Sequence, residues 1–338
     1  MNKKYIAVLP LILVILFQNC KSDSTANSVF GTGPDSATAE QKPVEKPVDT
    51  LALRTLADSL LRHYNYDSSW AQMTPVIPGA ILPFHRIVAF YGNLNSTRMG
   101  ILGEIPKDQM IKKLFGEVEN WQRADSTVKV IPALHLIVTV AQKDPGRDKM
   151  YRGRMNSNMI KKIIHWADSI DALVFLDIQV GHSTLLRELQ PLDSFLSLPR
   201  VHLGIDAEFA MHTKKVPGTI MGQFEAEEIN QAIDFLQQKV RENHLPPKIL
   251  IIHRFKRKMI QNADRIKNPP EVQVVMDMDG WGNKELKFSS WRDYIRKEPV
   301  QYTGFKLFYK NDTKSGTPLL TPTEVLTRTP QPLYIQYQ

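Results

Sequence analysis

The sequence predicts a (β/α)8 barrel of the TIM type, preceded by a signal peptide and a disordered tether. Eight strand-like runs follow one another from residue 85 onward, and amphipathic stretches lie between most of them. The last run ends at the C-terminus, where it can pair with the first and close a barrel. We therefore expect residues 49–338 to form one α/β barrel domain, within the usual size of this fold.

The strand-like runs are rich in β-branched and aromatic residues, and most of them are apolar almost throughout. This is the pattern of parallel strands that are covered on both faces. The expected strands are His85–Tyr91, Val128–Leu134, Ala172–Gln179, Val201–Glu208, Lys248–His253, Val272–Asp279, Tyr302–Phe308 and Pro332–Tyr337.

Apolar residues at helical spacing, with charges between them, predict the helices. The expected helices are Asp108–Trp121, Asn158–Ile170, Thr184–Leu196, Glu225–Asn243, Met259–Ile266 and Leu286–Arg296. Thr321–Glu324 is a capping box with Pro322 at the first helical position, which predicts a short last helix. A further amphipathic helix, Leu51–Tyr64, precedes the first strand, where it can cap the bottom of the barrel.

An open doubly wound sheet is the alternative fold, but no Gly-x-Gly-x-x-Gly or P-loop follows the first strand. The composition, 42% hydrophobic and 23% charged, is that of a globular protein. A single cysteine excludes a disulfide scaffold and a thiolate metal cluster. The net charge of +8, or +6 after Lys3 and Lys4 leave with a signal peptide, is too weak to predict a nucleic-acid partner.

The first twenty residues resemble the signal peptide of bacterial lipoproteins. Lys3 and Lys4 are followed by an apolar run, residues 6–17, which is too short to span a bilayer, and then by Cys20. The resemblance implies that residues 1–20 are a lipoprotein signal peptide and that Cys20 is lipidated, which anchors the chain to a membrane of the bacterial cell envelope. Gln18 and Asn19 stand where such signals usually carry small residues. The alternative is a plain secretory signal, or an uncleaved anchor, with a chance cysteine.

Residues 21–48 are rich in Ser, Thr, Ala, Pro, Lys and Glu, and their one aromatic residue is Phe30. Such a segment cannot bury a core, so we expect a flexible linker. A linker after a lipidated cysteine would let the barrel domain work at a distance from the membrane.

Polar and ionisable residues gather at the ends of the expected strands, where the active site of this fold lies. Asp206 and Glu208 are two residues apart on one strand, so their side chains should share a face. Neighbouring carboxylates repel each other, and one of them should keep its proton near neutral pH, as a general acid must. Asp279 or Asp177, on other strands, is then the candidate base or nucleophile.

Other polar and aromatic residues of the same ring are candidates for substrate binding, because sugar rings stack on aromatic side chains. They are Tyr91, His135, Gln179, His253, Trp281, Lys306, Tyr309 and Gln336. Lys306 is also a candidate counter-charge for one of the carboxylates.

Asp206-Ala207-Glu208 resembles the end of the chitinase-type glycosidase motif, and also the Asp-x-Glu pair of secreted muramidases. The resemblance implies that Glu208 is the proton donor and that Asp206 modulates it. The chain has Gly204 and Val201 where the chitinase pattern carries further aspartates. Several strand ends together also resemble a family of uncharacterised bacterial envelope proteins.

These observations support three hypotheses about function. The first is a glycoside hydrolase that acts on a polysaccharide or peptidoglycan, without a cofactor or metal. The second is a glycan- or solute-binding lipoprotein that retains the barrel but not the turnover. The third is a metal-dependent hydrolase, in which His253 would converge with two aspartates such as Asp177 and Asp279. Nucleophilic serine catalysis has no support, because the chain contains no Gly-x-Ser-x-Gly.

Overall fold

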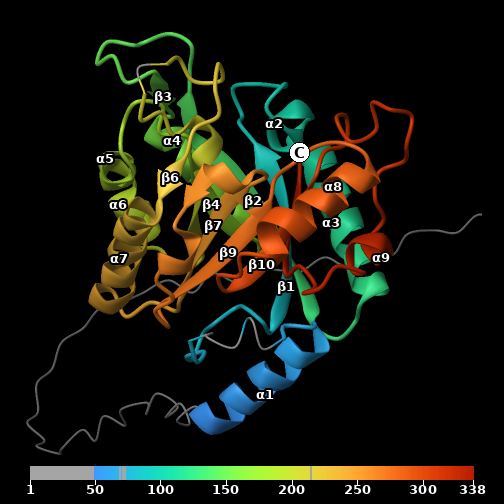
Figure 1. Cartoon of the computed structure of the whole chain (residues 1–338). Helices are drawn as coiled ribbons and strands as arrows, with labels where there is room; N and C mark the ends of the chain where they lie inside the picture. Colours follow the sequence, from blue (N-terminus) through green and yellow to red (C-terminus); the bar gives the residue numbers. More distant parts are fainter. Residues whose placement is uncertain (1–48, 68–69, 71–73, 214) are drawn as a thin grey trace, which may run out of the picture. The chain divides into compact units, whose positions relative to one another are not determined.

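A closed barrel of eight parallel strands is the centre of the structure (Figure 1). This computed structural model describes residues 49–67, 70, 74–213 and 215–338. The barrel strands are β1 (His85–Gly92), β2 (Lys129–Ala141), β4 (Leu173–Ile178), β5 (Val201–Asp206), β7 (Lys248–Arg254), β9 (Val272–Met278), β10 (Tyr302–Leu307) and β11 (Tyr334–Tyr337). Because β1 pairs in parallel with both β11 and β2, the sheet closes on itself and the predicted fold is confirmed.

Each of the eight expected strands is present, and its bounds differ from the prediction by at most two residues, except at the end of β2. β2 continues to Ala141, because β3 (Arg152–Arg154) pairs antiparallel with its last residues. β5 ends at Asp206 and not at Glu208, because the chain turns there into a 3₁₀ helix, Ala207–Phe209. A separate pair of short strands, β6 (Phe224–Glu225) and β8 (Ile260–Gln261), lies outside the barrel sheet.

Helices cover the outer face of the barrel, and one continuous apolar cluster fills the space between helices and strands. The longest are α3 (Lys107–Ala124), α4 (Ser157–Asp168) and α7 (Ala226–Glu242). The shorter ones are α2 (Ile101–Glu104), α5 (Leu185–Leu189), α6 (Asp193–Leu196), α8 (Lys284–Ser290), which continues as a π-helix over Trp291–Arg296, and α9 (Pro322–Val325).

Two expected helices differ from the prediction. Residues 259–266 do not form a helix: the chain runs through β8 between two 3₁₀ turns, Arg257–Met259 and Ala263–Arg265, and Asn262 has a left-handed backbone with φ 54°. The expected helix over residues 184–196 is divided into α5, a 3₁₀ turn and α6. The division falls at Pro191, which lacks the backbone N–H that a continuous helix needs.

Helix α1 (Thr50–His63) precedes the barrel and leads into residues that close the amino end of its strands (Figure 1). Tyr66 and Trp70 belong to the same apolar cluster as Ile87 and Tyr302 inside the barrel. The Tyr66 hydroxyl accepts a hydrogen bond from the backbone N–H of Thr303 at 3.1 Å. The polar end of the barrel is therefore the opposite one, at the carboxyl ends of the strands.

The interior of the barrel has an apolar lower half and a polar upper half. Alternate residues of a strand face inward, so Phe175 packs in the apolar cluster while Asp177, two residues later, lies in the polar half. Likewise, Ile251 packs in the apolar cluster, and His253, two residues later, lies in the polar half. The inward positions of β5 and β10 are Gly204 and Gly304, and their missing side chains leave room for Asp177 and Asp277 respectively.

Among the described residues, no helix has both the length and the hydropathy required to cross a membrane. Residues 1–20 with Cys20, and the linker of residues 21–48, lie outside the described residues. The lipoprotein signal, the lipidated cysteine and the flexible linker therefore stay predictions.

We predict that Gly204→Ala destabilises the protein by about 1–3 kcal/mol, because an added methyl would overpack the barrel interior. A Cβ at this position would lie 2.5 Å from Nε2 of His135 and 2.6 Å from Oδ1 of Asp177. Gly116, in α3, is the matched control: a Cβ there meets no atom within 4 Å, so Gly116→Ala should stabilise the protein by about 0.5–1 kcal/mol. Urea unfolding of the three proteins measures both changes, and an unchanged midpoint for Gly204→Ala would contradict the packing described here.

Candidate active site

A pocket of about 400 Å³ lies at the carboxyl ends of the barrel strands. Seven residues that the sequence predicts for the site line it: Tyr91, Gln179, Asp206, Glu208, Asp279, Trp281 and Lys306. The other lining residues are Arg98, Met99, Ile137, Val140, Ala141, Phe209, Phe255, Phe308, Asn311 and Gln338. The structure thus gathers residues from β1, β2, β5 and β10, and from the loops that follow β4 and β9, around one hollow.

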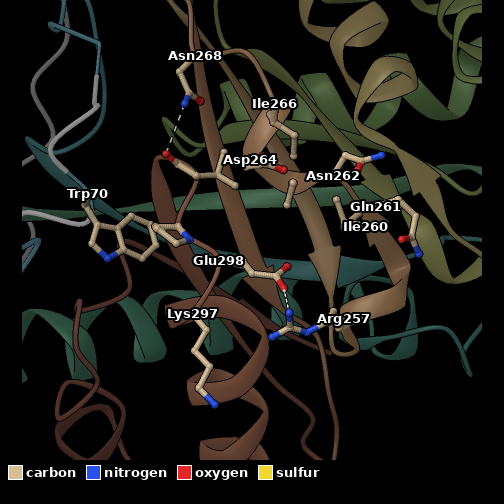
Figure 2. Close-up of a pocket in the computed structure, with 13 residues that line it drawn as sticks. Trp70, Arg257, Ile260, Gln261, Asn262, Asp264, Ile266, Asn268, Lys297 and Glu298 are labelled. Atoms are coloured by element: carbon tan, nitrogen blue, oxygen red, sulfur yellow. Dashed lines mark hydrogen bonds and ion pairs between the residues drawn. The ribbon is translucent and has the colours of Figure 1, made fainter.

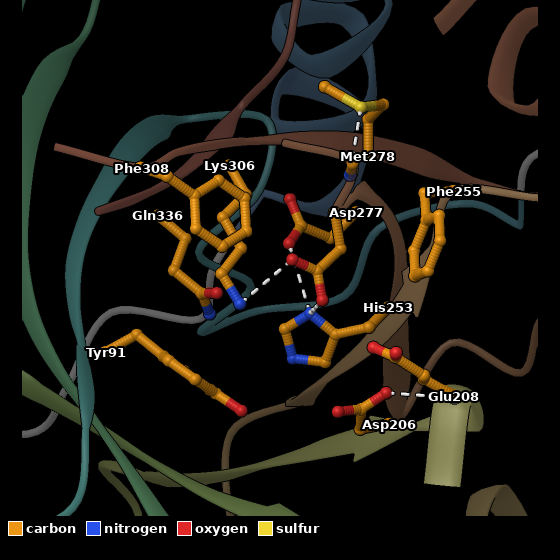
Figure 3. A network of polar contacts seen from close by, with 12 residues as sticks. Tyr91, Asp206, Glu208, His253, Phe255, Asp277, Met278, Lys306, Phe308 and Gln336 are labelled. Carbon is orange, nitrogen blue, oxygen red and sulfur yellow. Dashed lines mark hydrogen bonds and ion pairs between the residues drawn. The ribbon is translucent and has the colours of Figure 1, made fainter. Parts of the chain in front are cut away.

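Glu208 carries the free carboxyl group of the pocket. It lies in the 3₁₀ turn after β5, where its backbone N–H donates to Oδ1 of Asp206 at 3.0 Å (Figure 3). Gln179 donates to the other oxygen of Asp206 at 3.1 Å. Among the described residues, the Glu208 side chain has neither a hydrogen-bond partner nor an ion-pair partner. Its carboxyl group is therefore available to a ligand.

The surroundings of this pair raise the pKa of both carboxyl groups. Burial, and then the nearby carboxyls of Asp206 and Asp279, raise the pKa of Glu208 to about 8. Burial also raises the pKa of Asp206 to about 6: His253 and Lys306 oppose this rise, whereas Asp279 and Asp177 add to it. Glu208 is therefore predominantly protonated at pH 7, which is the state of a general acid.

Asp279 has the opposite electrostatic environment. Lys306 Nζ lies 2.9 Å from its Oδ1, and Nδ1 of His253 lies 3.2 Å from its Oδ2. Burial raises the pKa of Asp279, but Lys306 and His253 together outweigh burial, so its pKa lies below the usual value. Lys306 Nζ also lies 3.8 Å from the centre of the Tyr91 ring, a cation–π contact that fixes the ammonium group. One pocket thus contains a protonated free acid and an ionised carboxylate.

Four predicted site residues lie beneath the pocket and not in its lining: His135, Asp177, His253 and Gln336. All four are fully buried. The Tyr91 hydroxyl donates to Oδ2 of Asp177 at 2.8 Å, which places Tyr91 between this aspartate and the pocket. The structure therefore does not place Asp177 where a substrate in the pocket would contact it.

The buried groups beneath the pocket have strongly perturbed ionisation. Burial lowers the pKa of His135 to about 4, so this imidazole is neutral at pH 7. Burial also lowers the pKa of His253, but Asp177 and Asp279 outweigh it, and the pKa of His253 lies well above its usual value. Burial raises the pKa of Asp177, but His253 and His135 outweigh it and lower that pKa. Positive charge on His253 and negative charge on Asp177 thus stabilise each other.

Tyr309 is the predicted site residue that the structure places elsewhere. Its ring stacks on Tyr337 in the layer between barrel and helices, and its hydroxyl donates to Glu117 of α3 at 2.8 Å. The reason is the alternation of a strand: Lys306 and Phe308 face the pocket, so the next residue faces outward.

Several functional positions were not among the predicted site residues. Asp277 is fully buried, with its Oδ2 3.3 Å from Nδ1 of His253, and Tyr334 lies with its hydroxyl 2.6 Å from Nδ1 of His135. Both could have been found from the alternation, because they precede Asp279 and Gln336 by two residues. Arg98 and Asn311 come from loops, and the sequence carries no signal that places them in the pocket.

A second pocket, of about 640 Å³, lies away from these residues (Figure 2). It is lined by β8, the flanking 3₁₀ turns, Trp70 and residues 297–300. Glu298 in this pocket is ion-paired with Arg257 at 2.8 Å and also contacts Arg254. The other acid in its lining, Asp264, is exposed, so the larger pocket lacks the half-buried free acid that distinguishes the one at the strand ends.

We predict that Lys306→Met destabilises the protein by about 3–5 kcal/mol, because it leaves the Asp279 carboxylate buried without its ammonium partner. The side chains of Lys306 and Asp279 are 3% and 8% exposed. Lys310→Met is the control, since it removes a pair with Glu104 in which the lysine is 70% exposed, and it should cost at most about 1 kcal/mol. Equal losses in chemical unfolding experiments would contradict this description of the buried pair.

Comparisons with known proteins give only distant structural likenesses. No family model matches the chain, and no curated protein matches it. A ruminal GH26 endo-β-1,4-mannanase is 11% identical, with a TM-score of 0.31 over 91% of this chain and 66% of that one. A GH26-CBM35 β-(1,4)-mannanase of Podospora anserina is 10% identical, with a TM-score of 0.33 over 89% of this chain and 64% of that one. A dihydropteroate synthase of Coxiella burnetii is 8% identical, with a TM-score of 0.34 over 76% of this chain and 89% of that one. The barrel assignment rests on the strand pairing, and the chemistry rests on the pocket.

Proposed function

We propose that the protein is a glycoside hydrolase that acts on a polysaccharide or peptidoglycan, with Glu208 as the general acid. The observation that supports this proposal is the pairing of a free, protonated Glu208 with an ionised Asp279 in one pocket. Glycoside hydrolysis needs two carboxyl groups in different ionisation states: one protonates the leaving oxygen, and the other acts as nucleophile or as the base that activates water.

The neighbouring residues support these two roles. Asp206 accepts the Glu208 backbone N–H, which fixes the turn that carries the acid, and it also raises the pKa of Glu208. Lys306 holds Asp279 in the anionic state. In this proposal Glu208 gives its proton to the glycosidic oxygen as the bond breaks, and Asp279 attacks the anomeric carbon or takes a proton from the attacking water.

Aromatic residues of the pocket support a carbohydrate substrate. Trp281, between Gly280 and Gly282, is 56% exposed at the pocket, and Phe209 and Phe255 also line it. The apolar C–H faces of sugar rings can stack on such side chains, while Gln179 and the carboxyl groups offer partners for hydroxyl groups.

A non-catalytic glycan-binding function is the second candidate, and the Lys306–Asp279 ion pair favours it. At 2.9 Å this pair occupies one oxygen of the second carboxylate, which weakens that carboxylate as a nucleophile or base. In a binding protein the same charged groups would hold sugar hydroxyls without cleaving a bond.

The deciding experiment incubates the full-length protein in detergent micelles with purified peptidoglycan and a panel of polysaccharides, and detects new reducing ends by mass spectrometry. We expect Glu208→Gln to reduce product formation about 10²- to 10⁴-fold. Glu119→Gln, on the outer face of α3 where Glu119 is 70% exposed, is the control and should keep full activity.

The outcomes separate the hypotheses. If Glu208→Gln forms the same amount of product as the wild type, the protein is an enzyme, but Glu208 is not its general acid. Absence of products, together with a glycan that raises the melting temperature of both the wild type and the variant, would favour the binding protein.

The pH dependence of kcat/KM should follow the proton on Glu208, which Asp206, Asp279, Lys306 and His253 surround. Because the acid must be protonated and its pKa is raised to about 8, activity should persist at pH 7 and fall about tenfold per unit well above pH 8. The residual activity of Glu208→Gln should lack this alkaline limb. A kcat/KM that already falls as the pH rises through the ordinary pKa of glutamate would contradict the proposal.

We also propose that Cys20 is lipidated and that the barrel domain lies outside the cytoplasm, at the bacterial cell envelope. The sequence pattern of residues 1–20 supports this proposal. Cells that express the full chain should incorporate labelled palmitate into it, and Cys20→Ala should abolish the label. A label that survives this substitution would exclude Cys20 as the site of modification.

A further inference from the structure

We infer that His135, Asp177 and His253 bind a divalent transition-metal ion, such as Zn²⁺, inside the barrel beneath the pocket. This inference goes beyond the proposed hydrolase and does not depend on it. One potential ligand atom from each of the three side chains lies within 4.8 Å of the other two, and all three side chains are fully buried. The three residues come from β2, β4 and β7, so rigid strands hold them in place.

The spacing of these atoms fits coordination better than hydrogen bonding. Oδ1 of Asp177 lies 3.7 Å from Nε2 of His135 and 3.6 Å from Nε2 of His253. Both distances are too long for hydrogen bonds. Zinc–ligand bonds of about 2.0–2.1 Å in a tetrahedron place neighbouring ligand atoms about 3.3–3.4 Å apart, so the two distances to Asp177 need only a small contraction.

The same three atoms lack other partners. Nε2 of His135, Oδ1 of Asp177 and Nε2 of His253 are buried side-chain atoms without a hydrogen bond among the described residues. Buried polar atoms are rarely left unpaired in native proteins, and here three of them converge on one point. Gly204 faces this point, and any side chain there would fill it, because a Cβ would lie 2.5 Å from Nε2 of His135.

The remaining polar atoms of two of these side chains are held as metal ligands usually are. Metal-binding histidines donate the other ring N–H to a carboxylate or another acceptor, which fixes ring orientation and tautomer. Nδ1 of His135 lies 2.6 Å from the Tyr334 hydroxyl and 3.0 Å from Nε2 of Gln336. With its proton on Nδ1, His135 can donate to the Tyr334 hydroxyl and direct the lone pair of Nε2 inward. Oδ2 of Asp177 accepts from the Tyr91 hydroxyl at 2.8 Å, which leaves Oδ1 free.

His253 completes the pattern with carboxylates. Its Nδ1 lies 3.3 Å from Oδ2 of Asp277 and 3.2 Å from Oδ2 of Asp279, whereas its Nε2 lies 3.6 Å from Oδ1 of Asp177. These distances resemble the carboxylate–histidine–metal arrangement, but Nδ1 of His253 forms no hydrogen bond among the described residues. Among the described residues neither Asp177 nor Asp277 has a lysine or arginine ion-pair partner, and the basic groups within ion-pair distance of these two carboxyl groups are the imidazoles of His135 and His253.

Two imidazoles and one carboxylate suit Zn²⁺ and its first-row neighbours better than Mg²⁺ or Ca²⁺, which prefer oxygen ligands. A water molecule would take the fourth position. Because His253 also contacts Asp279 of the pocket, the ion would position that carboxylate from below. His135, Asp177 and His253 are thus metal ligands and positioning residues, whereas the pocket residues contact the substrate.

The test measures metal in the full-length protein in detergent micelles, after removal of metals with a chelator, reloading with Zn²⁺ and dialysis. We expect about one Zn²⁺ per chain by elemental mass spectrometry, and visible absorption bands of a four-coordinate site after Co²⁺ is bound in its place. His135→Gln and Asp177→Asn should lose the ion. His165→Gln, which alters an exposed histidine of α4, is the matched control and should keep it.

Tyr334→Phe keeps all three ligands and removes only the hydroxyl beside His135, so it serves if the ligand variants fail to fold. It should weaken Zn²⁺ binding about 10- to 100-fold in competition with a chromophoric chelator. Wild-type protein that retains no Zn²⁺, a folded His135→Gln that retains the full equivalent, or a Tyr334→Phe affinity equal to that of the wild type would each overturn the inference. Because the readout is bound metal, none of these results depends on hydrolase activity.

Discussion

The compensation of buried charge in the upper half of the barrel is the constraint on which the candidate site depends. Asp177, Asp277 and Asp279 enter this region from strands, and burial alone would keep each of them neutral. Lys306 and His253 outweigh burial at Asp279 and lower the pKa of its carboxyl group. His253 and His135 outweigh burial in the same way at Asp177. Asp277 keeps a raised pKa because burial outweighs its contact with His253.

Glu208 differs from these residues because no cation pairs with it directly. The Lys306 ammonium contacts Asp279, and Glu208 extends from a turn at the edge of the same pocket. Its high pKa is a consequence of burial first and then of the nearby carboxyl groups of Asp206 and Asp279, which outweigh the opposing effect of Lys306. The proposed chemistry therefore needs the whole arrangement: a compensated anion on one side of the pocket and an uncompensated acid on the other.

The sequence predicted the barrel because its signals are local. Apolar runs such as Val201–Asp206 and Lys248–Arg254 are short, frequent and rich in β-branched residues, and they can hardly form anything but buried strands. Prediction failed where one residue changed the backbone. Asn262, with its left-handed conformation, and Pro191 each interrupted a stretch with helical spacing.

For the site, the sequence predicted which strand-end residues face inward, but not how deep they lie. The alternation correctly grouped Asp206, Asp279 and Lys306 at one end of the barrel. Whether a side chain lines the pocket or lies beneath it depends on strand stagger and on Tyr91, which separates Asp177 from the pocket. Such relations between distant strands leave no mark in a single sequence.

The central claim is that Glu208 is a free carboxylic acid that keeps its proton at neutral pH. The most direct test is a pH titration of its side-chain carboxyl carbon by NMR, in protein labelled with ¹³C at glutamate. Comparison with Glu208→Gln assigns the signal. The account predicts a midpoint near 8. A midpoint near 4.5, the ordinary value for glutamate, would show that the pocket does not hold this proton and would contradict the account.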